Sequence, residues 1–575
     1  MFKTARSFDG LAGRVACVVA ACGLAISAPA LAAPPVLDFV PEDASGVVAI
    51  NNLGGAMGDL RAFMNASNLP AMEGEMQAML SEVDGVAVNA AGSAAFFMDA
   101  DGESIVLLPV KNYKEFVTAR GGVGAGVEEI DFGGQPTVVK RVSDNFAALA
   151  PANMAEALDG WEPTKGHMAK HVESMGSRSL DAAESADVFI IGSIAAMADD
   201  WREGYEGMKG MAMMFGGPEA AQGFATIDPI VGAFLTDAQT GVVALDFAAD
   251  GVTARFLSRF KEGSMLAGLF TGKSDTGSLL ERVPDMPFAF AGAIDTSAPG
   301  VRSLLSMMQE NLPQDKAGQA KVVMDMLKNS TGQAFVMGAP SMQEMSIGAG
   351  AFVRSAVYYR SENPAKLKSS VAEGMKLADG QKMEQDGLTI VTSTSYRPEA
   401  RTIEGVTVDE WGMQTNFEGE PNEQTMQAQM AMSMMFGSNG LGGYLTSVDN
   451  GVIMTMSRNS QMLTQTLGTA KNGGGLGTNA DVSAISGKLP ENRAFEVYIG
   501  VDKLLGIGAA FLGDIPPMPP VGIVAASGDG TAEIALHISP AVISKGMEIG
   551  MMMGAGMGGP GMDFEEGDDD GGPAF

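Results

Sequence analysis

Cysteine is nearly absent from this sequence, and the two cysteines present lie close to its start. The chain has 575 residues, and its cysteines are Cys17 and Cys22. Both fall within residues 1–32, a segment that we expect to be removed, so the mature chain would contain none. Disulfide bonds, thiol nucleophiles and thiolate metal sites are therefore excluded, and the fold must depend on burial of apolar side chains.

Histidine and the large aromatic residues are also scarce. The sequence has three histidines, three tryptophans and seven tyrosines, and it contains no Gly-x-Ser-x-Gly motif. The usual pairs of nucleophile and base therefore have few ways to form. Carboxylates are plentiful, so composition leaves a glycosidase-type pair of acids open, but no spacing selects one. We find no cofactor motif and expect the protein to use no cofactor.

Basic residues are outnumbered by acidic residues. Lysine and arginine together number 37, against 69 aspartates and glutamates. Removal of residues 1–32 takes away three basic residues and Asp9, which leaves 34 against 68 and a net charge near −34. Such a surface repels phosphate backbones and anionic headgroups. We therefore expect no nucleic-acid partner.

Apolar runs long enough to cross a membrane are missing beyond the N-terminal segment. There, basic residues precede an apolar stretch from Val15 to Ile26, and Pro29 and the triplet Ala30-Leu31-Ala32 follow. This order is typical of a secretory signal peptide cleaved after Ala32. We expect an exported protein, periplasmic or extracellular, with no transmembrane span. A lipoprotein is the alternative, because Val19-Ala20-Ala21-Cys22 resembles the box at which lipoproteins are cleaved and acylated on cysteine.

What the sequence does contain is one order of elements that occurs twice. Asp144-Asn145 and Asp449-Asn450 each precede an apolar strand and a short helix. Val40-Pro41-Glu42 and Val283-Pro284-Asp285 likewise each precede a strand and a helix. The shared order predicts an internal duplication of more than about 200 residues.

Alternating and helical apolar patterns predict the individual elements. The strands predicted in the first half are 46–50, 93–98, 104–110, 127–132, 136–142, 146–150, 186–191, 241–248 and 252–260. The helices predicted there are 55–64, 71–83, 111–119 and 194–214. The second half is predicted to contain a strand at 288–294, a helix at 299–308, a hairpin at 348–359, strands at 451–456 and 494–499, and a hairpin at 523–538.

Hairpins joined directly by turns indicate antiparallel pairing, so the predicted fold class is α+β. We predict two duplicated domains, at residues 33–262 and 281–546, each an antiparallel sheet with helices packed largely on one face. Glycine interrupts the pattern at 263–280, which we interpret as a linker. Residues 547–575 are rich in methionine and glycine and then acidic, and we expect a disordered tail there.

The signal segment, the two Val-Pro-acid openings and the segment Leu107-Leu108-Pro109-Val110-Lys111-Asn112-Tyr113 together resemble a family of exported bacterial proteins. This family is the domain-of-unknown-function class numbered 3352, with similar chains in planctomycete-type bacteria. The resemblance implies an exported protein and carries no assigned activity or site residues.

Two of the three histidines are spaced as a pair of metal ligands. His167 and His171 stand at i and i+4 in a predicted helix, a spacing that zinc ligands use on one helix face. The glutamate of a metalloprotease motif is missing between them, and Glu173 lies off the shared face. Either a metal site completed from elsewhere or a solvated helix face explains the pair. We interpret His537, in a predicted strand, as structural.

Methionine is abundant, with 42 residues. Two tracts read Met-Ala-Met-Met-Phe-Gly and Met-Ser-Met-Met-Phe-Gly, and their methionines are Met211, Met213, Met214, Met432, Met434 and Met435. Thioethers bind cuprous ion, so these residues are candidate Cu(I) ligands. Methionine also packs in helices and lines adaptable apolar grooves, and we favour that interpretation.

Two further motifs match known sites only in part. Residues 267–274 fit a relaxed phosphate-loop pattern that ends in Lys273-Ser274, but such a loop needs a preceding strand and a following helix. Asp99-Ala100-Asp101-Gly102 resembles a fragment of a calcium loop, and we interpret it as a hairpin turn because the later ligands are missing.

The sequence favours a non-enzymatic exported envelope protein that binds an apolar ligand or a partner protein in a groove lined by methionine-rich helices. Two alternatives stay open: a hydrolase that uses paired carboxylates or a histidine-bound metal, and a protein that binds Cu(I) through the methionine tracts. The sequence leaves the oligomeric state undetermined.

Overall fold

The computed structural model describes residues 33–44, 46–69, 87–98, 104–270, 272, 274–310, 317–340, 350, 353–385, 388–418, 423–437, 440–508 and 515–557. The predicted signal peptide at 1–32, the predicted helix at 71–83, the turn at 99–102 and the tail residues 558–575 lie outside this part of the chain. None of the described helices combines the length and the apolar character that crossing a membrane requires.

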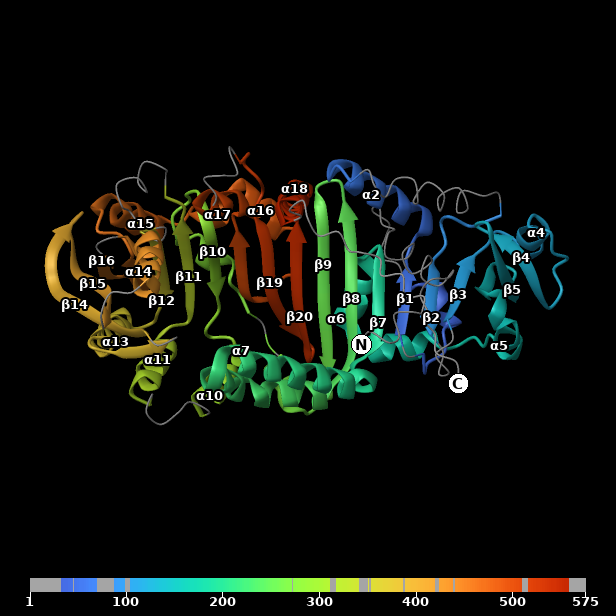
Figure 1. Cartoon of the computed structure of the whole chain (residues 1–575), viewed down its shortest axis with the longest axis horizontal. Helices are drawn as coiled ribbons and strands as arrows, with labels where there is room; N and C mark the ends of the chain where they lie inside the picture. Colours follow the sequence, from blue (N-terminus) through green and yellow to red (C-terminus); the bar gives the residue numbers. More distant parts are fainter. Residues whose placement is uncertain are drawn as a thin grey trace, which may run out of the picture.

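The described residues form one continuous antiparallel sheet of twenty strands. Figure 1 shows the strands side by side along the long axis of the molecule, with green β9 next to red β20 where the two halves of the chain meet. The strand pairings give the order β4-β5-β6-β3-β2-β1-β7-β8-β9-β20-β19-β18-β10-β11-β12-β17-β16-β15-β14-β13.

The strands are short at the centre of each half and longest in the hairpins. Those of the first half are β1 (Gly46–Ile50), β2 (Ala94–Met98), β3 (Ser104–Pro109), β4 (Val127–Phe132), β5 (Gln135–Ser143), β6 (Phe146–Pro151), β7 (Val188–Ser193), β8 (Ala238–Ala248) and β9 (Gly251–Phe260). Those of the second half are β10 (Phe288–Ile294), β11 (Gly332–Gly338), β12 (Arg354–Arg360), β13 (Lys382–Gln385), β14 (Leu388–Ile403), β15 (Val406–Glu418), β16 (Leu441–Val448), β17 (Gly451–Thr455), β18 (Arg493–Ile499), β19 (Val521–Gly528) and β20 (Thr531–Ile538).

The helices connect these strands. They are η2 (Pro35–Asp38), α2 (Leu53–Ala66), α4 (Tyr113–Thr118), η4 (Ala152–Met154), α5 (Ala155–Gly160), α6 (Met168–Ser185), α7 (Ile194–Asp237), α8 (Met265–Leu269), α9 (Gly277–Leu280), α10 (Pro299–Glu310), α11 (Ala317–Asn329), α13 (Pro364–Leu377), α14 (Glu423–Phe436), α15 (Ser460–Asn472), η6 (Leu476–Thr478), α16 (Ala480–Ser486), α17 (Val501–Gly508) and α18 (Pro540–Met557).

The mixed class with an antiparallel sheet is therefore confirmed, and one predicted hairpin is wrong. We placed a hairpin at residues 348–359, but β12 begins at Arg354 and pairs with β11, about twenty residues earlier in the chain. The pattern of β11 is a short apolar run between Gly332 and Gly338. Such a run is hard to distinguish from a loop in a chain this rich in glycine and alanine.

Every pairing among β1–β9 has a counterpart among β10–β20 once β13 and β14 are set aside. The pairs that β1 makes with β2 and β7 correspond to those that β10 makes with β11 and β18. The pair β3–β6 corresponds to β12–β17, and the pairs β4–β5 and β5–β6 correspond to β15–β16 and β16–β17. The pair β2–β3 corresponds to β11–β12. The pairs β7–β8 and β8–β9 correspond to β18–β19 and β19–β20.

The helices that follow β3 and β12 also begin in the same way. The Asn112 side chain accepts a hydrogen bond from the Glu115 N–H group, 3.1 Å away, at the start of α4. The Asn363 side chain accepts one from Lys366 N–H, also at 3.1 Å, at the start of α13. Both asparagines satisfy an N–H group that the first helical turn leaves without a partner.

Helices cover both faces of the sheet, which corrects our prediction of helices largely on one face. In β2, Ala94 and Phe96 belong to the core beneath α2 and α4, whereas Ala95 and Phe97 belong to the core beneath η2, α5 and α6. Successive side chains of a strand point to opposite faces. Because all four are apolar and buried, each face of the sheet needs its own cover.

Two predicted boundaries also need correction. The segment predicted as a linker at 263–280 contains α8 and α9, which bury Leu266, Leu269, Leu279 and Leu280. Residues 547–557 of the predicted tail instead belong to α18, which continues to Met557. Methionine and alanine favour helix, and α18 packs on α2.

The two halves meet at a buried ion triad on the β9–β20 pair. The Glu533 side chain of β20 is 0% exposed and accepts hydrogen bonds from Arg178 of α6 and from Arg255 of β9. The nitrogen–oxygen distance is 2.6 Å in both ion pairs. The two arginines, 14% and 21% exposed, come from the first half and the carboxylate comes from the second.

Replacing Glu533 with alanine removes the acid from this triad and leaves two largely buried guanidinium groups together. We expect Glu533→Ala to lower the free energy of unfolding by about 3 kcal/mol, because an uncompensated buried charge is costly. Urea denaturation measures the change. The matched control is Glu418→Ala, which breaks the ion pair between Glu418 and Lys382. These two side chains are 49% and 57% exposed, so the variant should lose less than about 1 kcal/mol of unfolding free energy. Equal losses in the two variants would contradict a special role for the junction.

Candidate functional site

A hollow forms where β15 extends beyond the end of β16. The two strands pair over Asp409 to Met413, opposite Leu445 to Leu441. Beyond Met413, β15 continues along β14 to Glu418. The chain between β15 and β16 forms α14, whose residues are mostly methionine, glutamine and alanine, all good helix formers. α14 contacts β15 and stands beside the part of the strand that β16 leaves uncovered.

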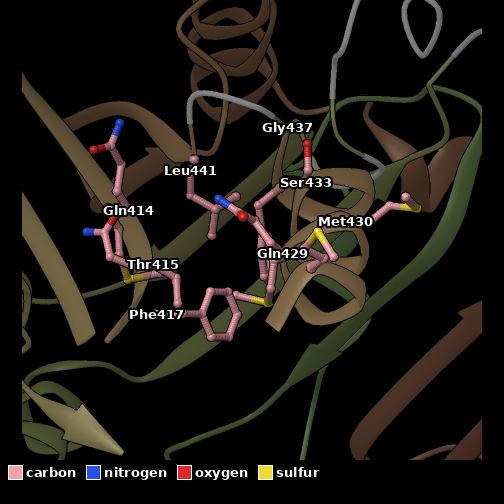
Figure 2. Close-up of a pocket in the computed structure, with 14 residues that line it drawn as sticks. Gln414, Thr415, Phe417, Gln429, Met430, Ser433, Gly437 and Leu441 are labelled. Carbon is pink, nitrogen blue, oxygen red and sulfur yellow. The ribbon is translucent and has the colours of Figure 1, made fainter. Parts of the chain in front are cut away.

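We call this hollow the methionine groove, and its volume is about 500 Å³. Figure 2 shows Gln414, Thr415 and Phe417 on the strand side, facing Gln429 and Met430 of α14. The lining residues that come from α14 are Met426, Gln429, Met430, Met432, Ser433 and Phe436. Those from the strands are Met413, Gln414, Thr415, Asn416, Phe417 and Leu441.

The methionines of the groove are exposed to solvent to an unusual degree. Met426 is 57% exposed and Met430 is 67% exposed. They stand one helical turn apart, so they lie on the same face of α14. Large apolar side chains that gather in a hollow and remain in water indicate a surface that is covered when a ligand or partner binds.

The second methionine tract of the sequence contributes to this groove only in part. Met432 lines it, whereas Met435 is 38% exposed and does not belong to the lining. The side chain of Met434 lies outside the described part of the structure. Sequence reasoning missed Met413, Met426 and Met430, although Met426 and Met430 have the helical spacing to Ser433 that marks one face.

The first tract lies on α7, which folds back on itself. The Tyr205 hydroxyl donates to Asp228 at 2.7 Å, and the Trp201 and Phe234 rings stack with centroids 6.0 Å apart. A straight helix would separate these partners by more than about 30 Å. In sequence, the midpoint of both pairs lies close to Gly217, where Gly-Gly-Pro interrupts the helical pattern.

The two tracts do not occupy corresponding places. α7 connects β7 to β8, whereas α14 connects β15 to β16, which correspond to β4 and β5. Met211, Met213 and Met214 lie within α7, and their side chains lie outside the described residues. Met211, Met213 and Met214 therefore stay predicted Cu(I) ligands that the described part of the structure does not test.

The two paired histidines have different surroundings. His171 is buried in α6, and its Nε2 atom is 2.9 Å from the Val40 carbonyl oxygen. Burial lowers the pKa of His171, so the ring is neutral and Nε2–H donates to Val40. His167 stands just before the first residue of α6. In the part of the chain that is described, no three His, Cys, Asp or Glu side chains gather as a metal site would require.

The remaining motifs are accounted for by local structure. Ala267 and Gly268 lie inside α8, so the phosphate-loop pattern lacks the strand–loop–helix context it needs, and Lys273 lies outside the described residues. The calcium-loop fragment at 99–102 also lies outside them. His537 is buried, and its Nδ1 atom is 3.0 Å from the Thr253 hydroxyl across the β9–β20 pair.

A wide crevice of about 1300 Å³ gathers acidic side chains beside α6 and α8. The carboxylates that line it are Glu42, Asp43, Glu173, Glu262 and Asp529. Lys170 and Arg259 also line it, and the Ser177 hydroxyl donates to Asp529 at 2.7 Å. Clustered acids in a hollow are what the hydrolase alternative requires.

Three acids on α2 and on the neighbouring strands form a second group that the sequence did not reveal. Asp187 precedes β7, Asp246 lies in β8 and Asp59 lies in α2. Burial, together with the nearby Asp246 and Asp59, raises the pKa of Asp187 to about 7, against the Phe247 N–H group that donates to it at 2.9 Å. Burial and Asp246 raise the pKa of Asp59 to about 6. The sequence signal for this group was Asp246, an acid within the apolar run of β8.

Comparisons with known proteins do not assign a family. No family model matches the sequence, and no curated protein matches it. A solved structure described as crystal form I of TP0453 has 7% sequence identity and a TM-score of 0.19, and the match covers 41% of this chain and 82% of that one. A TM-score this low carries no conclusion about fold or function.

The raised pKa of Asp187 predicts an unusual dependence of stability on pH. Because the pKa of Asp187 is higher in the folded protein than in the unfolded chain, the folded state holds more protons between about pH 4 and pH 7. The contribution of Asp187 to folding stability is therefore full below about pH 4 and is lost as the pH rises to about 7. We expect Asp187→Asn to raise the melting temperature at pH 8 and to leave it nearly unchanged at pH 4, because the amide carries no charge.

Thermal unfolding between pH 4 and pH 8 provides the measurement, with Asp43→Asn as a control. Asp43 is an exposed acid, so its replacement should leave the pH profile unchanged. If the melting temperature of Asp187→Asn changed with pH in the same way as that of the unmodified protein, the pKa of Asp187 would not be raised.

Proposed function

We propose that this is a non-enzymatic exported protein of the bacterial envelope, which binds an apolar ligand or an apolar segment of a partner protein in the methionine groove. The observation that carries the proposal is the pair of exposed thioethers, Met426 and Met430, inside a hollow of about 500 Å³. A ligand that covers them removes apolar surface from water, which is favourable.

The chemistry of the lining suits an apolar ligand of variable shape. Methionine has three rotatable bonds and a polarisable sulfur, so it adapts to different partners. Phe417 and Leu441 give the hollow apolar surface from the strand side, while Gln429 and Ser433 supply polar groups from α14. The lining therefore combines apolar and polar groups in similar measure.

We also propose that the chain is an internal duplication of one α+β module. The matching pairings of β1–β9 and β10–β20 support this, as do the corresponding asparagine caps of α4 and α13. The resemblance to the domain-of-unknown-function class numbered 3352 extends the proposal to that family. α14, β13 and β14 have no counterpart among the described elements of the first half, so the groove belongs to the second module alone.

Two other functions have some support. Thioethers bind Cu(I), and the groove gathers several of them, so Cu(I) is the alternative occupant. An anaerobic titration with a competing chelator that shows no Cu(I) uptake excludes it. The acid-lined crevice favours a hydrolase with paired carboxylates. Absence of turnover across a panel of chromogenic glycosides excludes that activity for this substrate class.

The groove proposal predicts that binding of an apolar probe depends on Met426 and Met430. The double variant Met426→Gln, Met430→Gln keeps size and helix propensity but removes apolar surface. We expect the affinity for 1-N-phenylnaphthylamine, measured by fluorescence titration, to fall by about tenfold or more, because each buried methionine contributes roughly 1.5 kcal/mol or more.

Met265→Gln is the matched control for this experiment. Met265 is 48% exposed on α8, outside the groove, so its replacement should leave the affinity unchanged. Native mass spectrometry of the purified protein adds a second measurement, since a bound apolar molecule should be present before the probe is added. The same affinity in the double variant and in the unmodified protein would refute the groove proposal.

The export part of the proposal predicts the start of the mature chain. Cleavage after Ala32 leaves Ala33 as the first residue and removes both cysteines. We expect the intact mass of protein from the bacterial envelope to match residues 33–575. A mass that matches a chain beginning at an acylated Cys22 would instead establish the lipoprotein.

A further inference from the structure

A hollow of about 480 Å³ in the second half gathers three basic side chains. Arg282 follows α9, Arg360 ends β12, and Lys471 lies near the end of α15. Two acids, Glu362 and Asp449, share the lining, and both are exposed. Hydroxyl groups from Ser278, Thr331, Tyr358 and Ser361 complete it. In a chain with nearly twice as many acidic as basic residues, this local excess of positive charge is unusual.

Hydrogen bonds to two backbone carbonyls and one hydroxyl hold the guanidinium groups of Arg282 and Arg360 in place. Arg282 Nη1 donates to the Ala470 carbonyl at 2.9 Å. Arg360 donates to the Thr331 hydroxyl at 3.2 Å and to the Thr331 carbonyl at 3.0 Å. These contacts use neutral acceptors, so they orient the two arginines without neutralising their charge.

The neighbouring acids offset this charge only in part, because three basic side chains line the hollow against two acids. Asp295 approaches Arg360 only to 3.9 Å, and its oxygens accept hydrogen bonds from Ser297 and from the Asp275 N–H group. Tyr358 lines the same hollow and is buried. Burial raises the pKa of its phenol, and the Arg282 and Arg360 guanidinium groups each act against that rise. Arg282 and Arg360 therefore line one hollow together with Tyr358.

The corresponding place in the first half is filled by aromatic rings. Phe39 precedes Val40-Pro41 as Arg282 precedes Val283-Pro284, and Phe146 follows Asp144-Asn145 as Gly451 follows Asp449-Asn450. The Phe39 and Phe146 rings contact each other, with centroids 5.4 Å apart. The second half thus has an arginine and a glycine where the first has two packed rings.

Glycine at position 451 makes room for the polar lining. A Cβ atom there would lie 2.2 Å from the Tyr359 carbonyl oxygen and 2.8 Å from the Tyr358 ring. The Tyr358 ring therefore lies against the Gly451 backbone, and its hydroxyl donates to the Asn450 carbonyl at 3.1 Å. Arg282 and Gly451, in place of the two phenylalanine rings, thus leave a hollow and allow hydrogen-bond donors to line it.

We propose that this hollow, the arginine pocket, binds a small organic anion through a phosphate or carboxylate group. Guanidinium groups recognise both by charge-assisted hydrogen bonds in a planar arrangement. The volume exceeds that of inorganic phosphate, and the surrounding hydroxyls suit a ligand with polar substituents beside its charged group. The comparison with the first half rests on the proposed duplication, whereas the pocket itself does not.

Isothermal titration calorimetry of the purified full-length protein tests the pocket. The probes are inorganic phosphate, phenyl phosphate and citrate, which separate phosphate recognition from carboxylate recognition. We expect saturable binding of at least one probe, weakened about tenfold or more in Arg282→Gln, because a hydrogen bond to a charged group is lost. Lys471→Ala should weaken the same probe, and since Lys471 is exposed, this variant keeps the fold even if Arg282→Gln does not.

Lys366→Ala is the control, because Lys366 is an exposed lysine of α13 outside the pocket. It should bind the probe as the unmodified protein does. Absence of saturable binding for all three probes, or equal binding in Lys471→Ala and Lys366→Ala, would overturn the proposal. Either outcome is independent of the methionine groove, since the two experiments share no variant and no probe.

Discussion

The pairing of β9 with β20 is the constraint on which the architecture depends. Val252 faces Ile538 and Arg259 faces Thr531, so the two strands are hydrogen-bonded along almost their whole length. Each is the last strand of its half, and without the other it would be an exposed edge, which invites association with other chains. The pairing covers both edges at once and makes one sheet from two halves. The Arg178–Glu533–Arg255 triad then fixes which residues meet, because a buried carboxylate is stable only beside its two arginines.

Differences between the halves lie where elements have been inserted or where side chains at corresponding places differ. α7 extends the connection after β7, and α14 extends the connection after β15. β4 and β5, by contrast, are joined by a tight turn at Gly133 and Gly134. The common strands carry the buried cores, where substitutions are costly. Connections tolerate change more readily than buried strands, so the differences between the halves gather there.

The sequence predicted the fold class because local patterns decide it, whereas the assembly of the halves depends on contacts between distant residues. Alternation and turn residues were enough to place β1 and β4 with the observed bounds. The continuous sheet was not predictable, since nothing in the apolar pattern of β9 or β20 says that the two strands pair with each other. Helices on both faces could have been inferred from the uninterrupted apolar run Ala94-Ala95-Phe96-Phe97, which alternation alone does not explain. Methionine richness indicated an apolar groove, but the lining from Met413 and Phe417 required the register of β15.

The similarity of the two methionine tracts has a physical explanation that does not need common descent. They lie in connections that do not correspond, so duplication of the module does not account for them. Both connections must form a helix that leaves the sheet and still presents apolar surface. Methionine satisfies both requirements, because it favours helix and is flexible enough to pack against an irregular neighbour. Polar or β-branched residues would meet only one of them, so methionine suits both connections without a common origin of the two tracts.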